Sequence, residues 1–231
     1  MYINAGTFIL QRSYSHHTLT GNLVKTRSKN VYILYNRISA EDGTDSYEID
    51  IPNGGRAYIV GNVIQQGASS QNRWIVEFGA EGQTAGHTDE LFVVNNTIVN
   101  DVGTGYGIFV ASWAKTPAVV RNNIFAGPFN TIVNQATALL QSNHLPADGD
   151  PMFVDAAAYD YRLKAGSPAI DKAVAPGSAF GFDWRRSSST CTRFSTSPAR
   201  PRVLAPQAVP TATSWANRSS RSADLTGGAG A

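Results

Sequence analysis

The sequence predicts an all-β fold, a right-handed parallel β-helix (solenoid) of about five to six coils. A short tract recurs five times: mostly apolar residues, one variable residue, an asparagine, then apolar residues again. Each tract is rich in Val, Ile, Leu and aromatic residues and too short for a core helix, which indicates buried strands. Successive asparagine positions lie 20 to 34 residues apart, a spacing typical of stacked repeats.

The repeated asparagine is expected to have a structural role. Asparagine tolerates the left-handed backbone region, so we place it at a sharp bend between two strands. Identical amides stacked from coil to coil can also form a hydrogen-bonded ladder. The tracts are Tyr32–Ile38, Tyr58–Ile64, Phe92–Ile98, Val119–Phe125 and Leu139–Leu145, and Phe8–Tyr14 is a sixth with Ser13 in the asparagine position.

A second family of strands is expected after each bend, at a variable distance. Two strand families in a fixed order give one turn of a solenoid per repeat, with parallel pairing and right-handed crossovers. The longest connecting loop, Gly79–Glu90, is expected to form the wall of a groove. The second strands are Leu23–Arg27, Tyr47–Ile51, Trp74–Phe78, Ile108–Ala111 and Thr131–Asn134.

A resemblance to a known family adds to this prediction. The tracts, together with the segments Asp150–Asp155, Asp160–Leu163 and Gly166–Asp171, resemble right-handed parallel β-helix proteins of the pectate-lyase-like group. The resemblance covers roughly residues 1–175. It implies an exported bacterial protein that acts on or binds a polysaccharide.

The chain divides into three parts by composition. Residues 1–145 are expected to form the coils, residues 146–183 an irregular C-terminal cover, and residues 184–231 a disordered tail rich in Ser, Arg and Pro. The tail holds seven arginines and one acid, whereas residues 1–183 hold 12 Lys and Arg against 16 Asp and Glu. The folded part is therefore mildly acidic, which argues against a nucleic-acid partner.

The N-terminus and the single cysteine bear on the cellular location. No cap for the open end of a solenoid precedes Thr7, so we expect an N-terminally truncated part of a longer β-helix. Residues 1–6 lack the basic and apolar regions of a signal peptide, although the resemblance implies an extracytoplasmic parent protein. Cys191 has no partner for a disulfide within the chain. No stretch approaches the ~20 apolar residues of a membrane span. We also expect the protein to be a monomer.

Charged residues gather on three consecutive second strands. Alternation along a strand places Lys25, Asp50 and Glu77 on the outer face, with Asp50 between the other two on rungs ~4.8 Å apart. A charge cluster confined to three coils is typical of a functional site, although ordinary cross-strand ion pairs give the same pattern. With Arg27 these residues are the candidate catalytic groups. The candidate substrate-binding residues are Tyr47, Glu48, Trp74, Glu81 and His87.

Two reactions suit these residue types. In β-elimination of a uronate polymer, a cation neutralises the carboxylate and a base removes the neighbouring proton, and Lys25 or Arg27 suits either role. In glycoside hydrolysis, Asp50 and Glu77 share the acid and base roles at separations of ~5–9 Å. Asp50, Glu77 and Glu81 are also a candidate Ca²⁺ site, and whether the protein requires a metal stays open. His16 and His17 are expected to be solvated or capping at a bend, in preference to a catalytic role.

We therefore expect a carbohydrate-active protein that acts on or binds an acidic polysaccharide, with a polysaccharide lyase ahead of a glycoside hydrolase. The chondroitinase-B and alginate-lyase types of β-helix lyase place Lys and Arg on different coils beside a Ca²⁺ cluster. Here Lys25 and Arg27 share one strand, so the lyase mechanism does not transfer directly. A non-catalytic scaffold or adhesin, or an inactive fragment, is the alternative, and enzymatic activity stays open.

Overall fold

Parallel strands stacked in three sheets make up most of the protein. The computed structural model describes residues 2–3 and 5–185. Sheets A and B each contain six parallel strands and sheet C contains five. Each of the first five coils contributes one strand to each sheet, in the order A, B, C along the chain, and the last coil contributes strands to sheets A and B. The tail expected from residue 186 to residue 231 lies outside the described residues.

The strands are short, as the apolar tracts indicate. Sheet A comprises β1 (Tyr2–Ile3), β4 (Val24–Thr26), β7 (Ile49–Ile51), β10 (Trp74–Phe78), β13 (Gly105–Val110) and β16 (Phe129–Val133). Sheet B comprises β2 (Thr7–Gln11), β5 (Asn30–Leu34), β8 (Gly55–Val60), β11 (Asp89–Val94), β14 (Val119–Arg121) and β17 (Leu139–Gln141). Sheet C comprises β3 (Tyr14–His16), β6 (Arg37–Ser39), β9 (Val63–Gln66), β12 (Thr97–Asn100) and β15 (Ile124–Ala126).

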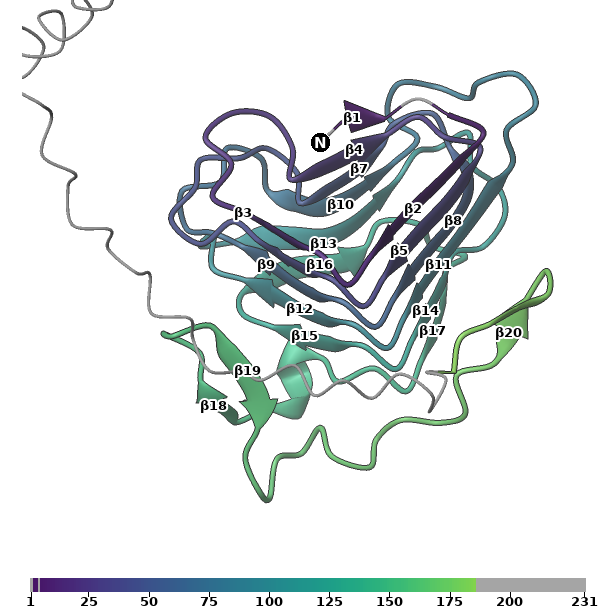
Figure 1. The fold of residues 1–231 in the computed structure, drawn as a ribbon. Coiled ribbons are helices and arrows are strands. Elements are labelled where there is room, and N and C mark those ends of the chain that lie inside the picture. Colours follow the sequence, from purple (N-terminus) through teal and green to yellow (C-terminus); the bar gives the residue numbers. More distant parts are fainter. Residues whose placement is uncertain (1, 4, 186–231) are drawn as a thin grey trace, which may run out of the picture. The chain divides into compact units, whose positions relative to one another are not determined.

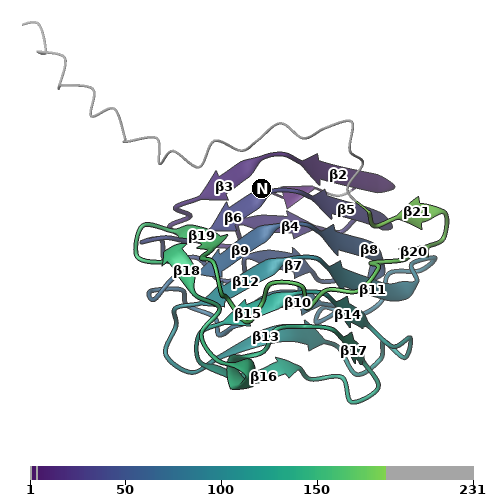
Figure 2. The same ribbon diagram turned by 90° about the horizontal axis from the view of Figure 1, so that it is seen from below.

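The coils are right-handed. In Figure 1 the chain runs from sheet A at the top to sheet B on the right and sheet C on the left, and it recedes from the viewer as it turns clockwise. Figure 2 shows the same coils as a ladder of rungs with the first coil at the top. The prediction of a right-handed parallel β-helix of about five to six coils is confirmed.

The repeated asparagines form a continuous buried ladder between sheets B and C. From Asn62 onward each side-chain oxygen accepts the backbone N–H and the amide of the asparagine one coil earlier, as Asn96 does from Asn62 at 2.9 Å in both bonds. The same pattern repeats along the ladder, whose members are Asn36, Asn62, Asn96, Asn123 and Asn143. The ladder satisfies backbone groups at a corner that no β-sheet pairing reaches.

The bend itself differs from the sequence prediction in two respects. The left-handed residue is the variable one before the asparagine, as at Tyr35 (φ 56°), Asn95 (φ 57°) and Asn122 (φ 56°). The asparagine is thereby free to orient its amide along the solenoid axis. There are also three strand families instead of two, because each apolar tract continues past the bend and supplies a strand to sheet B and another to sheet C.

The C-terminal segment covers the outer faces of two sheets. It comprises the 3-10 helix η1 (Pro146–Asp148) and the antiparallel pairs β18 (Phe153–Asp155) with β19 (Asp160–Leu163) and β20 (Ser178–Ala179) with β21 (Phe182–Asp183). The first pair packs through Phe153 and Tyr161 on Val99 and Ala126 of sheet C.

The second pair covers sheet B. Phe182 and Trp184 pack on an aromatic stack in which the Tyr58 ring lies 5.0 Å from both Tyr32 and Phe92. Trp184, which the sequence placed in the tail, is 4 % exposed, so the ordered part includes it. Within the described residues, neither C-terminal pair lies on sheet A (Figures 1 and 2). The described part also contains no helix with the length and apolar character needed to cross a membrane.

Candidate functional site

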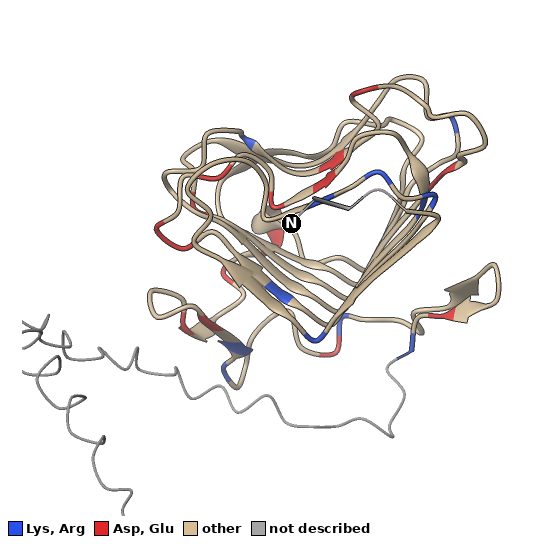
Figure 3. Ribbon diagram, turned by 45° about the horizontal axis from the view of Figure 1, so that its top comes forward, with Lys and Arg blue, Asp and Glu red and all other residues tan. Residues whose placement is uncertain are grey.

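The outer face of sheet A brings the predicted charged column together. Lys25 pairs with Asp50 between β4 and β7, and Asp50 pairs with Glu77 between β7 and β10. Their strand neighbours Val24 and Ile49 point into the apolar core, so the column faces outward. Figure 3 shows acidic and basic segments side by side on this sheet.

Asp50 and Glu77 form a buried carboxyl pair. They are 3 % and 2 % exposed, although their side chains lie on the outer face. Asp50 Oδ2 accepts hydrogen bonds from Lys25 Nζ at 2.7 Å and from the Asn22 amide at 2.5 Å. The other oxygens of the two carboxyls, Asp50 Oδ1 and Glu77 Oε2, accept no hydrogen bond from a donor among the described residues. The two carboxyls hydrogen-bond to each other, which requires a proton on one of them.

That proton belongs to Glu77. Burial, and then the hydrogen bond to Asp50, raise the pKa of Glu77 to about 9. Its Oε1 accepts the backbone N–H of Ala80, at the start of the loop after β10, which leaves Oε2 as the oxygen without a donor among the described residues. Glu77 is therefore neutral at neutral pH, and the ammonium of Lys25 lies 2.7 Å from the Asp50 carboxyl beside it.

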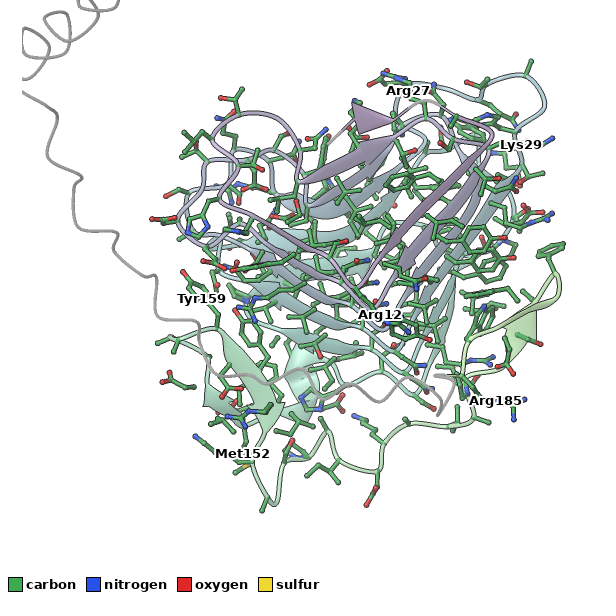
Figure 4. All side chains as sticks on the ribbon, viewed as in Figure 1. Arg12, Arg27, Lys29, Met152, Tyr159 and Arg185 are labelled. Atoms are coloured by element: carbon green, nitrogen blue, oxygen red, sulfur yellow. The ribbon has the colours of Figure 1, made fainter. Side chains whose placement is uncertain are left out.

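A second carboxylate lies above the column. Glu81, in the loop after β10, accepts a hydrogen bond from Lys25 Nζ at 2.9 Å and another from the Arg27 guanidinium. Arg27 also donates to the Asn53 side chain, and its position at the outer margin of sheet A is visible in Figure 4. Hydrogen bonds from Lys25 and then from Arg27 lower the pKa of Glu81. The Glu81 carboxylate is thus an anion held between two cations while its side chain stays 45 % exposed.

Half-buried aromatic rings continue this face. The Trp74 ring stacks on Tyr106 of the next coil, with ring centroids 4.7 Å apart, and meets the edge of Phe109 at 5.5 Å. Tyr47 is also half-buried, and its hydroxyl bonds to the Asn72 side chain near the carboxyl pair. Burial raises the pKa of Tyr47, so the phenol is neutral and able to donate.

Two predicted substrate-binding residues lie elsewhere. Glu48 is completely buried, because it precedes β7 and turns inward toward Asp45 and Gln66. Burial, followed by the negative charge of Asp45, raises the pKa of Glu48 well above its usual value. A substrate on the outer face does not reach it, so the assignment of Glu48 is corrected to a buried structural acid. His87 lies at the far end of the loop, where its backbone bonds to Thr84.

The sequence analysis missed several groups that build the site. Asn22 holds Asp50, Asn53 holds Arg27, and Tyr106 completes the aromatic stack. Trp113 fixes the base of the loop by donating from its indole to the Gly79 carbonyl at 2.7 Å. The signal for Asn53 was its place in an Asn-Gly-Gly turn at the margin of the column. No sequence signal marked Trp113.

No family model, curated protein or solved structure matches this chain.

The geometry disfavours the three expected chemical roles. Burial opposes the charge on Lys25, but hydrogen bonds to Asp50 and Glu81 outweigh it and raise the pKa, so the amine is protonated at neutral pH. An arginine does not act as a base either, because the guanidinium keeps its proton. The carboxyls of Asp50 and Glu77 hydrogen-bond to each other, so they lie closer together than the ~5–9 Å separation of a glycosidase pair. The candidate Ca²⁺ position between Asp50 and Glu81 is taken by the Lys25 ammonium.

Proposed function

We propose that the outer face of sheet A binds an acidic polysaccharide without cleaving it. The observation that carries the proposal is the Glu81 carboxylate between Lys25 and Arg27. Lys25 in β4 and Arg27 directly after it are two cations two residues apart that make a carboxylate-binding site, and Glu81 fills it from an exposed loop. A uronate carboxylate of a polymer has the same charge and shape, so it takes the place of the Glu81 carboxylate when the loop after β10 moves away from Lys25 and Arg27.

The surroundings of this carboxylate site suit a sugar chain. The half-buried rings of Trp74, Tyr106 and Phe109 continue the same sheet face, and pyranose rings stack on aromatic faces of this kind. The C-terminal pairs cover sheets B and C, which leaves sheet A as the face free of them among the described residues. A linear polymer therefore has a path across successive coils of sheet A.

Binding is favoured over elimination because Lys25 and Arg27, the candidate bases of that reaction, and Glu77 beside them are protonated at neutral pH. Hydrogen bonds to Asp50 and Glu81 stabilise the protonated form of Lys25, and Arg27 keeps its charge. Glu77 carries a proton that it shares with Asp50. These groups recognise an anion through charge and hydrogen bonds, which is the function of a glycan-binding solenoid.

Removing the internal competitor is expected to tighten binding. A tethered carboxylate competes at an effective concentration of roughly millimolar or above, so Glu81→Gln is expected to raise the affinity for polygalacturonate by about 3- to 10-fold. Lys25→Ala removes the cation that the polymer carboxylate needs and is expected to lower that affinity by about tenfold or more. Isothermal titration calorimetry at low and physiological salt measures both changes, and the affinity is expected to fall with salt.

The control is a second glutamate, Glu90, which lies in β11 directly after the same loop. Glu90 pairs with Arg56, with contacts of 3.3 Å, at the start of sheet B, so Glu90→Gln is expected to leave the affinity unchanged. Neutral, methyl-esterified polymer is expected to bind all variants weakly and alike. Two results would overturn the proposal: no acidic polymer bound by either the native chain or Glu81→Gln, or unsaturated uronate product released by the native chain.

A further inference from the structure

A second polar cluster lies at the end of sheet C, apart from the column on sheet A. His16 ends β3 and His17 follows it, while Glu41 and Asp42 follow β6 in the next coil. Because β3 and β6 pair with His16 opposite Ser39, the residues after both strands emerge at the same corner. One ligand atom each from His16, His17 and Glu41 lie within 4.8 Å of one another.

His17 Nε2 and the two carboxylates have the spacing of ligands around one metal ion. His17 Nε2 lies 3.2 Å from Glu41 Oε2 and 3.1 Å from Asp42 Oδ1. The Nδ1 atoms of His16 and His17 also face each other at close range. Bonds of ~2.0–2.1 Å to a tetrahedral metal place its ligand atoms ~3.3 Å apart, which is close to the spacing of His17 to the two carboxylates.

The backbone of both turns is held in place. The Glu41 N–H donates to the Gln65 side chain at 2.9 Å, and Thr44 N–H donates to the Thr18 carbonyl at 3.0 Å, which ties one turn to the other. A Cβ on Gly43 would lie 2.7 Å from the Thr18 carbonyl oxygen, so only glycine permits the two turns to approach this closely. The ligand side chains therefore start from fixed positions on adjacent coils.

Tyr14 orients two members of the cluster. Its ring stacks on His16 with centroids 4.0 Å apart and planes 21° apart, and its hydroxyl hydrogen-bonds to Glu41. Partners of this kind fix the rotamers of metal ligands and strengthen binding. The Glu41 side chain is 12 % exposed, so one carboxylate is largely withdrawn from water beside the exposed carboxylate of Asp42. A bound cation offsets the repulsion between these neighbouring negative charges.

We propose that His16, His17, Glu41 and Asp42 bind a divalent transition metal, of which Zn²⁺ is the best fit. Two imidazoles with carboxylate oxygens suit Zn²⁺, whereas Ca²⁺ and Mg²⁺ prefer ligand sets built from oxygen alone. The ion joins two consecutive coils at the corner of sheet C. This metal site is separate from the polysaccharide site on sheet A, and either proposal stands if the other fails.

The test is a Zn²⁺ titration of the full chain carrying Cys191→Ser, which removes the single thiol as a competing ligand. Competition with a chromophoric chelator is expected to give one tight site per chain, and thermal unfolding is expected to shift upward with Zn²⁺. His16→Ala and His17→Ala are each expected to weaken binding by about 100-fold, and Tyr14→Phe by about 10-fold. Ca²⁺ is expected not to compete.

His87→Ala is the matched control, because His87 lies on the loop after β10, and it is expected to bind Zn²⁺ as the parent does. Circular dichroism of each variant separates a lost site from a lost fold. The proposal fails if the double variant His16→Ala, His17→Ala binds Zn²⁺ as tightly as the parent while folded. It fails equally if Ca²⁺ displaces Zn²⁺, or if His87→Ala is the variant that loses the site.

Discussion

Replacing Asn96 with alanine is expected to lower the free energy of unfolding by about 4 kcal/mol, because each buried group left without a partner costs about 1–3 kcal/mol. The Asn96 side chain accepts from the backbone N–H and the amide of Asn62, and it donates to the Ile59 carbonyl and to Asn123. Asn96 is 2 % exposed, so water does not replace the lost bonds. Urea unfolding followed by circular dichroism measures the change.

The control for Asn96 is an asparagine outside the ladder. Asn30 makes one long side-chain contact, 3.4 Å to the Gly6 carbonyl, so Asn30→Ala is expected to change stability by less than about 0.5 kcal/mol. Asn96→Asp tests whether shape alone matters, since it keeps the size and the acceptor but loses both donated bonds. Near-native stability of Asn96→Asp at neutral pH would show that the ladder contributes little.

Glu77→Gln is expected to stabilise the protein at pH 7 by about 2–3 kcal/mol. The native state keeps Glu77 protonated with a pKa of about 9, whereas the unfolded chain ionises it near its usual 4.5. The stability from this raised pKa is therefore fully present below pH 4.5 and is lost as pH rises toward 9. A glutamine keeps the bond from Ala80 and donates to Asp50 without needing a proton, so it avoids a cost of about 1.4 kcal/mol per pH unit.

Unfolding free energies of the native chain and Glu77→Gln at pH 5, 7 and 8.5 check this sign, because their difference isolates Glu77 from Glu48 and the other buried acids. The difference is expected to widen as pH rises. Glu81→Gln is the matched control. Lys25 and Arg27 lower the pKa of Glu81, so the stability that Glu81 contributes is present above its usual pKa and is lost as pH falls. A Glu77→Gln variant less stable than the native chain at pH 8.5 would contradict a neutral Glu77.

Periodicity explains why the column was predictable. Lys25, Asp50 and Glu77 occupy equivalent positions in consecutive tracts, and a parallel solenoid converts equivalent positions into spatial neighbours. The histidine and carboxylate cluster was missed although the same signal was present. Residues that follow equivalent strands, such as His17 and Glu41, also meet, but here each lies beyond the end of its strand, where the register cannot be predicted from the repeat.

Burial explains where the sequence analysis was wrong. Glu48 and Asp50 lie two residues apart, yet one faces the interior beside Asp45 and the other faces the loop after β10. Alternation along an ideal strand does not hold at Glu48, because β7 begins only at Ile49. The protonation of Glu77 likewise depends on the cover that the loop provides.

The sequence by itself determined the coil: its apolar tracts, its asparagine spacing and the outer column follow from local repeats that stack by one rule. Only the tertiary structure decided which outer face the C-terminal segment leaves uncovered, which carboxyl keeps its proton and which loop carboxylate occupies the two cations. These features depend on desolvation and on contacts between residues far apart in the sequence, such as Glu81 with Lys25 and Trp184 with Phe92. Repetition encodes the scaffold, whereas irregular loops and the energies of buried charge set its chemistry.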